Sequence, residues 1–182
     1  MTSKNKEGAS TIVRHLINKG HRRIAYISTP PYYGDSTDYI YSRRYNGYKD
    51  ALQTNDIAID ESLIRFTGHE EEQKVGLIVK ELCSLPDPPT AIFASRDSLV
   101  VETIRALKGS GRAIPRDMAV VGFSDNAEIN NFIDPTLTSV VVPIEEMGTI
   151  AVSRITEILR SQDKLPPLQV SLDCSLTLGE SC

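Results

Sequence analysis

The chain has 182 residues, a formal net charge of −4 at pH 7, 40% hydrophobic residues and 24% charged residues. This length suits one principal core, and the composition is that of a soluble globular protein rather than a disordered or membrane-embedded one. Lysine and arginine are scattered along the acidic chain, so we expect no DNA-binding surface on this segment itself.

The N-terminus, the cysteines and the histidines give no sign of secretion, disulfides or metal binding. The first ten residues lack the apolar stretch of a secretory signal, which favours a cytoplasmic location. No CxxC pair is present, which favours reduced thiols over a disulfide framework. The histidines His15, His21 and His69 have no acidic or thiol partner at a metal-ligand spacing. We therefore expect neither a metal nor another cofactor.

Helical and extended patterns alternate along the first two thirds of the chain. Apolar residues spaced three and four apart predict helices over residues 8–19, 43–53, 75–82 and 97–107. Short apolar runs between them predict strands at 24–27, 63–66, 91–94 and 120–123. The runs lack polar alternation, as in strands that are covered on both faces. The expected fold class is therefore α/β, a Rossmann-like parallel sheet flanked by helices.

The last third of the chain does not continue this alternation of helices and strands. Residues 137–142 are expected to be extended, and Pro143 opens a long amphipathic helix over 144–160. After the stop at Pro166 and Pro167, residues 169–178 alternate enough to form one or two strands.

Several stretches occur in an order and at separations that resemble the regulatory domain of the LacI/GalR repressors. The two most recognisable are residues 89–94 followed by Asp97, and residues 114–117 running into 120–125, and residues 135–140 complete the set. Shorter similarities are the GHRRIA turn at 20–25 and Arg44 followed by Gly47 and Tyr48. Each stretch alone is weak, but the ordered combination is specific.

The resemblance implies a periplasmic-binding-protein-like type I fold of two lobes joined by crossing strands. Residues 1–137 would form a nearly whole C-terminal lobe, 138–162 would belong to the missing N-terminal lobe, and 163–182 would return to the first. The DNA-binding head would be absent, so DNA would be reached only through it. The apolar stripe of helix 144–160 would then dock on a second copy or fold back onto its own lobe.

Ligands of open parallel sheets bind outside the carboxyl ends of the strands, so the candidate site is taken from residues near those ends. Our candidates for ligand binding are Arg44, Arg96, Asp97, Ser124, Asp125, Tyr39, Tyr41 and His69. A guanidinium offers a fork of donors, and tyrosine offers a stacking face with a polar tip. The competing readings are an ion pair of Arg44 with Asp38 and core packing of the tyrosines, above all of Tyr45 and Tyr48.

Three positions depart from the pattern of the resembled family, and one of them is Val142, which stands where many members have a glutamine. Arg96 stands where many members place an acid or amide, and Ser124 where many place an acid. These changes favour a negatively charged effector, such as an acidic or phosphorylated sugar. Alternatively, Arg96 merely neutralises Asp97 or Asp125.

The leading hypothesis is an effector-sensing and dimerisation fragment of a LacI-type regulator that binds a sugar-like molecule and is not an enzyme. A homodimer surface could include Leu99, Val101 and residues 129–133, unless these are buried locally. A transport-type sugar-binding protein is the alternative. A small hydrolase is third, because residues 122–126 resemble a nucleophile elbow but have Asn126 in place of its second glycine.

Overall fold

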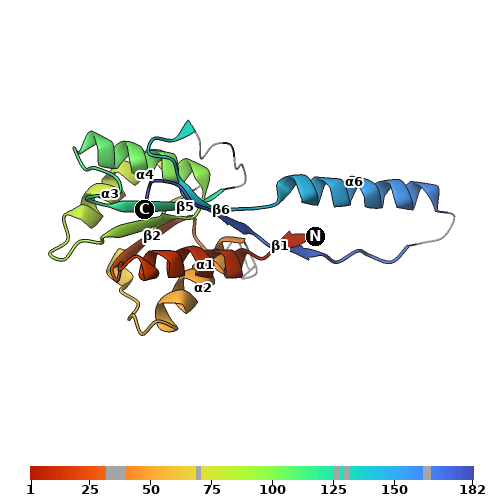
Figure 1. Cartoon of the computed structure of the whole chain (residues 1–182), viewed down its shortest axis with the longest axis horizontal. Coiled ribbons are helices and arrows are strands. Elements are labelled where there is room, and N and C mark those ends of the chain that lie inside the picture. The colour runs from red at the N-terminus through yellow and green to blue at the C-terminus, as the bar shows by residue number, and fades with distance from the viewer. Residues whose placement is uncertain (32–39, 69–70, 125–127, 129–131, 162–164) are drawn as a thin grey trace.

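The computed structural model describes residues 1–31, 40–68, 71–124, 128, 132–161 and 165–182. It has two parts (Figure 1). The body is a six-stranded sheet with helices on both faces, and it spans most of the chain before residue 142 together with the C-terminal strand. The arm consists of the helix α6 (Ile144–Arg160) and the short strands β1 (Thr2–Ser3) and β7 (Ser171–Leu172), which lie to one side of the body.

The sheet of the body has the strand order β3-β2-β4-β5-β6-β8. Its strands are β2 (Ile24–Ser28), β3 (Ile64–Phe66), β4 (Ala91–Ala94), β5 (Ala119–Ser124), β6 (Thr138–Val141) and β8 (Ser175–Thr177). Every neighbouring pair is parallel except β6 and β8, which are antiparallel. The predicted α/β class is confirmed, and the carboxyl ends of five parallel strands meet along one edge.

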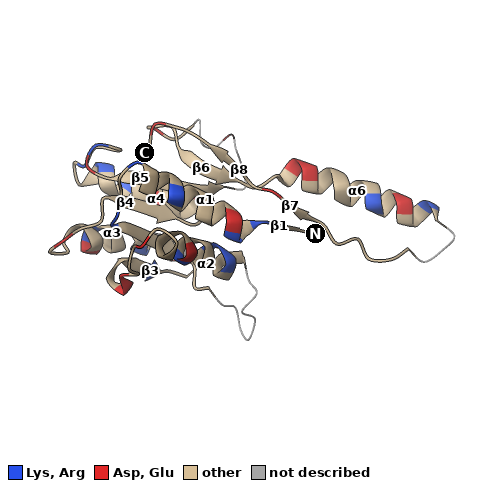
Figure 2. Ribbon diagram, turned by 60° about the horizontal axis from the view of Figure 1, so that its bottom comes forward, with Lys and Arg blue, Asp and Glu red and all other residues tan. Residues whose placement is uncertain are grey.

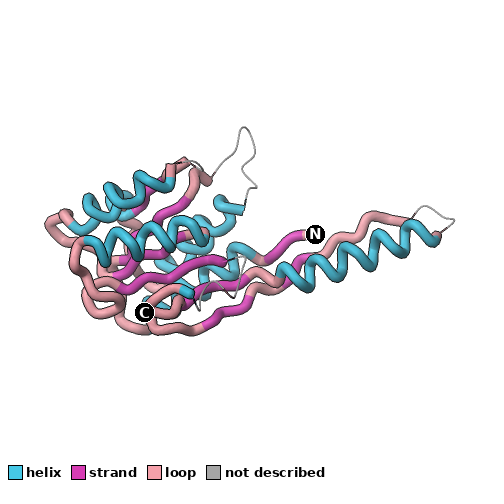
Figure 3. The backbone as a smooth tube through the Cα atoms, turned by 90° about the horizontal axis from the view of Figure 1, so that it is seen from above, coloured by secondary structure: helices cyan, strands magenta, loops and turns pink. Residues whose placement is uncertain are grey.

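Two pairs of helices cover the sheet, one pair on each face (Figure 3). They are α1 (Asn5–Asn18) with α2 (Ile40–Gln53), and α3 (Val75–Cys83) with α4 (Asp97–Gly109), accompanied by short 3-10 turns at Glu61–Leu63 and Glu72–Lys74. Successive residues of a strand pack against opposite helix layers. Tyr26 and Phe93 pack towards α1 and α2, whereas Ile27 and Ile92 pack towards α3 and α4. Continuous burial on both faces explains why the strand sequences lack polar alternation.

The helices α1 and α2 pack unusually close together at Gly47. A Cβ atom built at this position would lie 2.2 Å from the carbonyl oxygen of Lys6 and 2.8 Å from the Cβ of Ala9. Only a residue without a side chain allows the two backbones this approach. The glycine that the sequence analysis noted beside Arg44 thus serves to bring α2 against α1.

The arm differs sharply from the body in its burial. No residue of α6 is buried, and its exposed apolar side chains are Ile144, Val152, Ile155, Ile158 and Leu159. The helix stands away from the body, so in this structure of a single chain it is not folded back onto the lobe (Figure 2). The strands β1 and β7 pair in parallel, with Thr2 opposite Ser171. Among the described residues, no helix is long and apolar enough to cross a membrane.

Candidate functional site

The parallel strands deliver a set of polar residues to one edge of the sheet, which we call the rim. We define the rim as Ser28, Thr29, Thr67, Gly68, Ser95, Arg96, Asp97 and Ser124. The registers bring these residues together, because Ile27 pairs with Ala94 and Ser28 pairs with Phe66. Hydroxyl groups dominate the set, and those of Ser28, Ser95 and Ser124 are fully buried.

Arg44 reaches the rim from α2 and is itself buried. Its exposed fraction is 3%, and its Cζ lies 3.8 Å from the centroid of the Phe123 ring. Nε donates to Oδ1 of Asn5 at 2.8 Å, and Nη1 donates to the carbonyl oxygen of Ser95 at 2.5 Å. Arg44 therefore joins α2 to Asn5 of α1 and to the residue that follows β4, at the base of the rim. The predicted alternative, an ion pair with Asp38, involves a residue outside the described part of the chain.

A continuous series of buried hydrogen bonds runs through Arg44 from the arm to the rim. Asn5, which accepts from Arg44, donates through Nδ2 to the Oγ of Ser3 at 2.9 Å, and Ser3 is the last residue of β1. At the other end, Ser95 Oγ donates to Ser28 Oγ at 2.7 Å. The hydroxyl of Tyr26 donates to the same Ser28 oxygen at 3.1 Å, and burial raises the pKa of Tyr26 so that it stays neutral. These contacts tie the start of the chain to the ends of β2 and β4.

Arg96 lies on the opposite side of the rim from Arg44, towards α3 and α4. Its Nε donates to Oγ1 of Thr29 at 3.1 Å, its Nη1 donates to Oγ of Ser98, and its Nη2 lies 3.5 Å from the carbonyl oxygen of Gly68. The guanidinium therefore spans the ends of β2, β3 and β4. Asp97 follows as the first residue of α4, where the helix dipole favours a carboxylate.

The structure brings five of the eight predicted site residues together at or beside the rim. Tyr41 is buried, and the Cζ of Arg44 lies 5.6 Å from the centroid of its ring, so its face supports the guanidinium. The positions of Tyr39, His69 and Asp125 lie outside the described residues. The competing reading for two other tyrosines holds: Tyr48 donates to the carbonyl oxygen of Ile24 at 2.9 Å, and Tyr45 and Tyr48 both stack on Tyr26 in the core.

Several polar members of the site were not among the predicted ligand-binding residues. Ser28, Thr29 and Ser95 directly follow apolar strand residues, and that position was their only signal. Asn5 carried no such signal, because it meets Arg44 only after α1 and α2 have packed.

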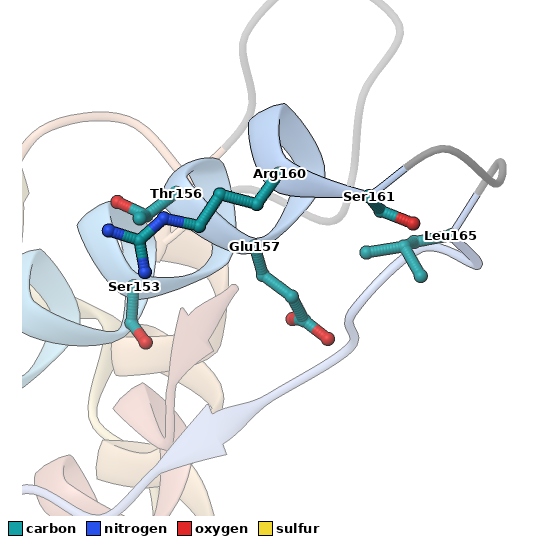
Figure 4. A pocket seen from close by; sticks show the side chains of 6 residues that line it. All are labelled: Ser153, Thr156, Glu157, Arg160, Ser161 and Leu165. Carbon is teal, nitrogen blue, oxygen red and sulfur yellow. The ribbon is translucent and has the colours of Figure 1, made fainter.

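Two further observations concern metal binding and a second hollow outside the rim. Among the described residues, no group of three or more histidine, cysteine or acidic side chains is arranged to hold a metal ion. A hollow of about 550 Å³ lies away from the rim, between the outer half of α6 and the returning chain at Leu165 (Figure 4). Arg160 and Glu157 both line it, and we interpret it as space beside the uncovered helix.

The fold and rim define a class, the periplasmic binding protein-like domain, and the model of this domain family matches residues 13–182. The regulator CelR of Thermobifida fusca is 32% identical over 97% of this chain and 50% of its own length. A probable opine utilization operon repressor of Rhizobium rhizogenes is 30% identical over 94% of this chain and 87% of its own. The crystal structure of a sugar-binding LacI-family regulator from Escherichia coli, complexed with phosphate, has 30% identity and a TM-score of 0.81 over 99% of this chain and 62% of that one.

The chain belongs to the effector-binding domains of the LacI/GalR family of transcriptional regulators. It spans about half the length of CelR but most of the length of the opine repressor. Its relatives regulate transcription, and the resemblance found in the sequence is confirmed.

Proposed function

We propose that this chain is the effector-sensing part of a LacI-type regulator and that it binds a sugar-like molecule at the rim. The observation that carries the proposal is the gathering of hydroxyls, a guanidinium and a carboxylate at the ends of β2, β3 and β4, where open parallel sheets bind ligands. The E. coli relative, named as sugar-binding and solved with phosphate, supports this choice of ligand.

The division of the chain that we propose follows from the contrast between body and arm. In this division residues 1–137 are the C-terminal lobe, 138–162 are the segment that crosses into an N-terminal lobe, and 163–182 return. The strand β6 at the start of the crossing segment still pairs with β5 in the body, so the crossing proper begins after it. The exposed apolar stripe of α6 supports this division, since leaving each such side chain in water forgoes about 1.5–3 kcal/mol. In a two-lobed regulator an effector acts through its different affinities for the open and closed arrangements of the lobes.

We also propose a homodimer, with a smaller surface than the sequence suggested. Leu99 is fully buried within the α3–α4 layer, so it belongs to the core and the expectation that it pairs with a second copy was wrong. Phe132 remains a candidate because 84% of its side chain is exposed. Residues 129–131 lie outside the described part of the chain. An isologous contact around Phe132 would place the same patch on both subunits.

The proposal includes no catalytic step and places the protein in the bacterial cytoplasm, where a DNA-binding regulator acts. Ser124, the residue that resembled a nucleophile, is fully buried at the end of β5. The transport alternative is less favoured, because the relatives reported above are regulators and a repressor.

A titration of the isotope-labelled chain with neutral and anionic sugars, followed by NMR, tests the proposal. We expect weak binding with shifts in the amide signals of Thr29, Ser95 and Ser124. Shifts confined to the outer groove between α3 and α4, lined by Val79, Cys83 and Ala106 among others, would place the ligand elsewhere and contradict the proposal.

A further inference from the structure

Resting on the proposed effector site, we infer that the rim and the arm are coupled, and that Asn5 is the positioning residue that couples them. The first step of the argument is the place of Asn5 in the chain. Ser3 ends β1, which belongs to the arm, and the backbone N–H of Lys4 still donates to the carbonyl oxygen of Leu172 in β7 at 2.8 Å. Asn5 is then the first residue of α1, which belongs to the body. The chain therefore passes from the arm into the body at this residue.

The second step is the direction of the hydrogen bonds that Asn5 makes. A guanidinium can only donate, so the 2.8 Å bond from Arg44 requires the amide oxygen Oδ1 to face it, which fixes the way the amide is turned. The other end of the amide, Nδ2, donates to Oγ of Ser3 at 2.9 Å and to its carbonyl oxygen at 3.2 Å. Asn5 and Ser3 are both buried, so water does not readily replace a bond that is lost at either end.

The third step is how a movement of the arm reaches Arg44. A displacement of β1 away from α1 by about 1 Å would stretch both bonds between Asn5 and Ser3 beyond hydrogen-bonding distance. The buried Nδ2 would then lack an acceptor, and rotation of the amide towards another one would withdraw Oδ1 from Arg44. Asn5 satisfies Arg44 and Ser3 together while β1 keeps its place, so the orientation of its amide depends on the position of the arm.

The packing of α1 on α2 transmits this change instead of absorbing it. Gly47 lies within one turn of Arg44 on α2, and a Cβ atom added to it would meet the carbonyl oxygen of Lys6, the residue after Asn5. The backbones of the two helices are therefore in contact at this level. A tightly packed contact has little room to shift, so a reoriented Asn5 amide acts on the Arg44 side chain.

The fourth step is the point at which the series of bonds reaches the rim. Nη1 of Arg44 donates to the carbonyl oxygen of Ser95 at 2.5 Å, and this carbonyl belongs to the peptide unit that leads into Arg96. Ser95 and Arg96 are both rim residues. Coupling between two sites is reciprocal, so a ligand that moves this peptide unit when it binds at the rim biases the position of β1 by the same free energy.

The test perturbs the arm and observes the rim by NMR on the labelled chain, without a ligand. The amide nitrogen of Arg96 is one reporter, because it shares a peptide unit with the Ser95 carbonyl, and the Nε–H signal of Arg44 is the other. Ser3→Ala removes the hydroxyl that accepts from Asn5 and should shift both signals. Unchanged reporters in this variant would overturn the coupling.

The matched control is the other hydroxyl of β1. Oγ1 of Thr2 accepts from Nη1 of Arg43 on α2 at 3.2 Å, so it also joins the arm to the body, but it lies outside the series that passes through Asn5. Thr2→Val should leave both reporters in place. Equal shifts in Ser3→Ala and Thr2→Val would mean that any disturbance of β1 reaches the rim, and would overturn the role of the series.

A double substitution assigns the coupling to Asn5. Asn5→Leu keeps the size of the side chain and removes its bonds to Ser3 and Arg44, so adding Ser3→Ala to it should produce no further shift of the Arg96 amide. A further shift as large as that in the unsubstituted chain would overturn the role of Asn5. If Asn5→Leu does not fold, the Arg44 Nε–H signal in Ser3→Ala decides, because Asn5 is the bond partner between the two. Failure of every sugar to bind at the rim would end the proposed function, whereas the coupling is judged by these variants alone.

Discussion

The helices α1 and α6 carry similar apolar stripes, yet one is covered and the other is not. In α1, Ile12, Val13 and Leu16 are fully buried against α2 and the sheet. In α6, Val152 is 65% exposed and Leu159 is 81% exposed. A periodic apolar pattern predicts that a helix has a buried face, but it does not say which surface provides the burial. The body supplies that surface for α1, whereas the described chain leaves every residue of α6 at least partly exposed.

The largest expected effect comes from removing a core side chain of the body and comparing it with the arm. Phe93 is fully buried between Tyr26 and the helices α1 and α2, so Phe93→Ala should lower the free energy of unfolding by about 3–5 kcal/mol. Ile158→Ala on α6 should change it by less than about 0.5 kcal/mol. Urea unfolding followed by fluorescence and circular dichroism measures both. Equal losses would mean that α6 is packed in solution and would end the distinction between body and arm.

A second prediction uses glycines to compare close packing with open space. Gly47→Ala should destabilise the body by at least about 2 kcal/mol, because the new methyl group would meet the backbone of Lys6 at 2.2 Å. Gly76→Ala on α3 is the matched control, since nothing lies within 4 Å of its added Cβ. Thermal unfolding of both variants gives the comparison. A tolerated Gly47→Ala would show that α1 and α2 can separate at little cost.

Much of the body could be predicted from the sequence because its determinants are local. The runs at 91–94 and 120–123 are short, apolar and bounded by turn residues. The first appears as β4 with the predicted bounds, and the second appears as β5 with one more residue at each end. The first residues of the helices were predicted less accurately. The helix α1 begins at Asn5, three residues before the predicted start, because polar residues that carry no apolar periodicity still complete its first turn.

The site was predictable only in part, for a physical reason. Position after a strand suggested Arg96 and Ser124, since parallel strands must end at one edge. The burial of Arg44 could not be read in the same way, because it depends on Asn5 and Phe123, which are distant in sequence. The pairing of β1 with β7 was equally hidden, because the two residues of β1 carry no pattern of their own.

A third, smaller effect tests whether the arm unfolds independently of the body. Nothing lies within 4 Å of a Cβ added at Gly148, and alanine is about 0.8–1.0 kcal/mol more favourable than glycine inside a helix. Gly148→Ala should therefore raise the helical circular dichroism signal and slow amide exchange in α6. The urea midpoint of the body should not change. A rise in that midpoint would show that α6 and the body unfold as one cooperative unit.

The smallest effect concerns an exposed ion pair at the end of the body opposite the arm. The carboxylate of Asp117 accepts from Nε and Nη2 of Arg116, at 2.9 and 3.1 Å, and from the backbone N–H of Ala113 at 2.8 Å. The hydrogen bonds from Arg116, followed by that from Ala113, lower the pKa of Asp117 to about 2. A carboxyl whose pKa is lowered on folding stabilises the folded state above its unfolded pKa near 3.8, and this contribution disappears as the pH falls towards about 2. NMR titration of the Asp117 carboxyl measures the shift. Arg116→Gln should move the pKa partly back towards 3.8, with the remainder held by the Ala113 N–H. An unshifted pKa in the unsubstituted chain would mean that this loop of the body is as loosely held as the arm, and the contrast between the two would then apply only to the core and the rim.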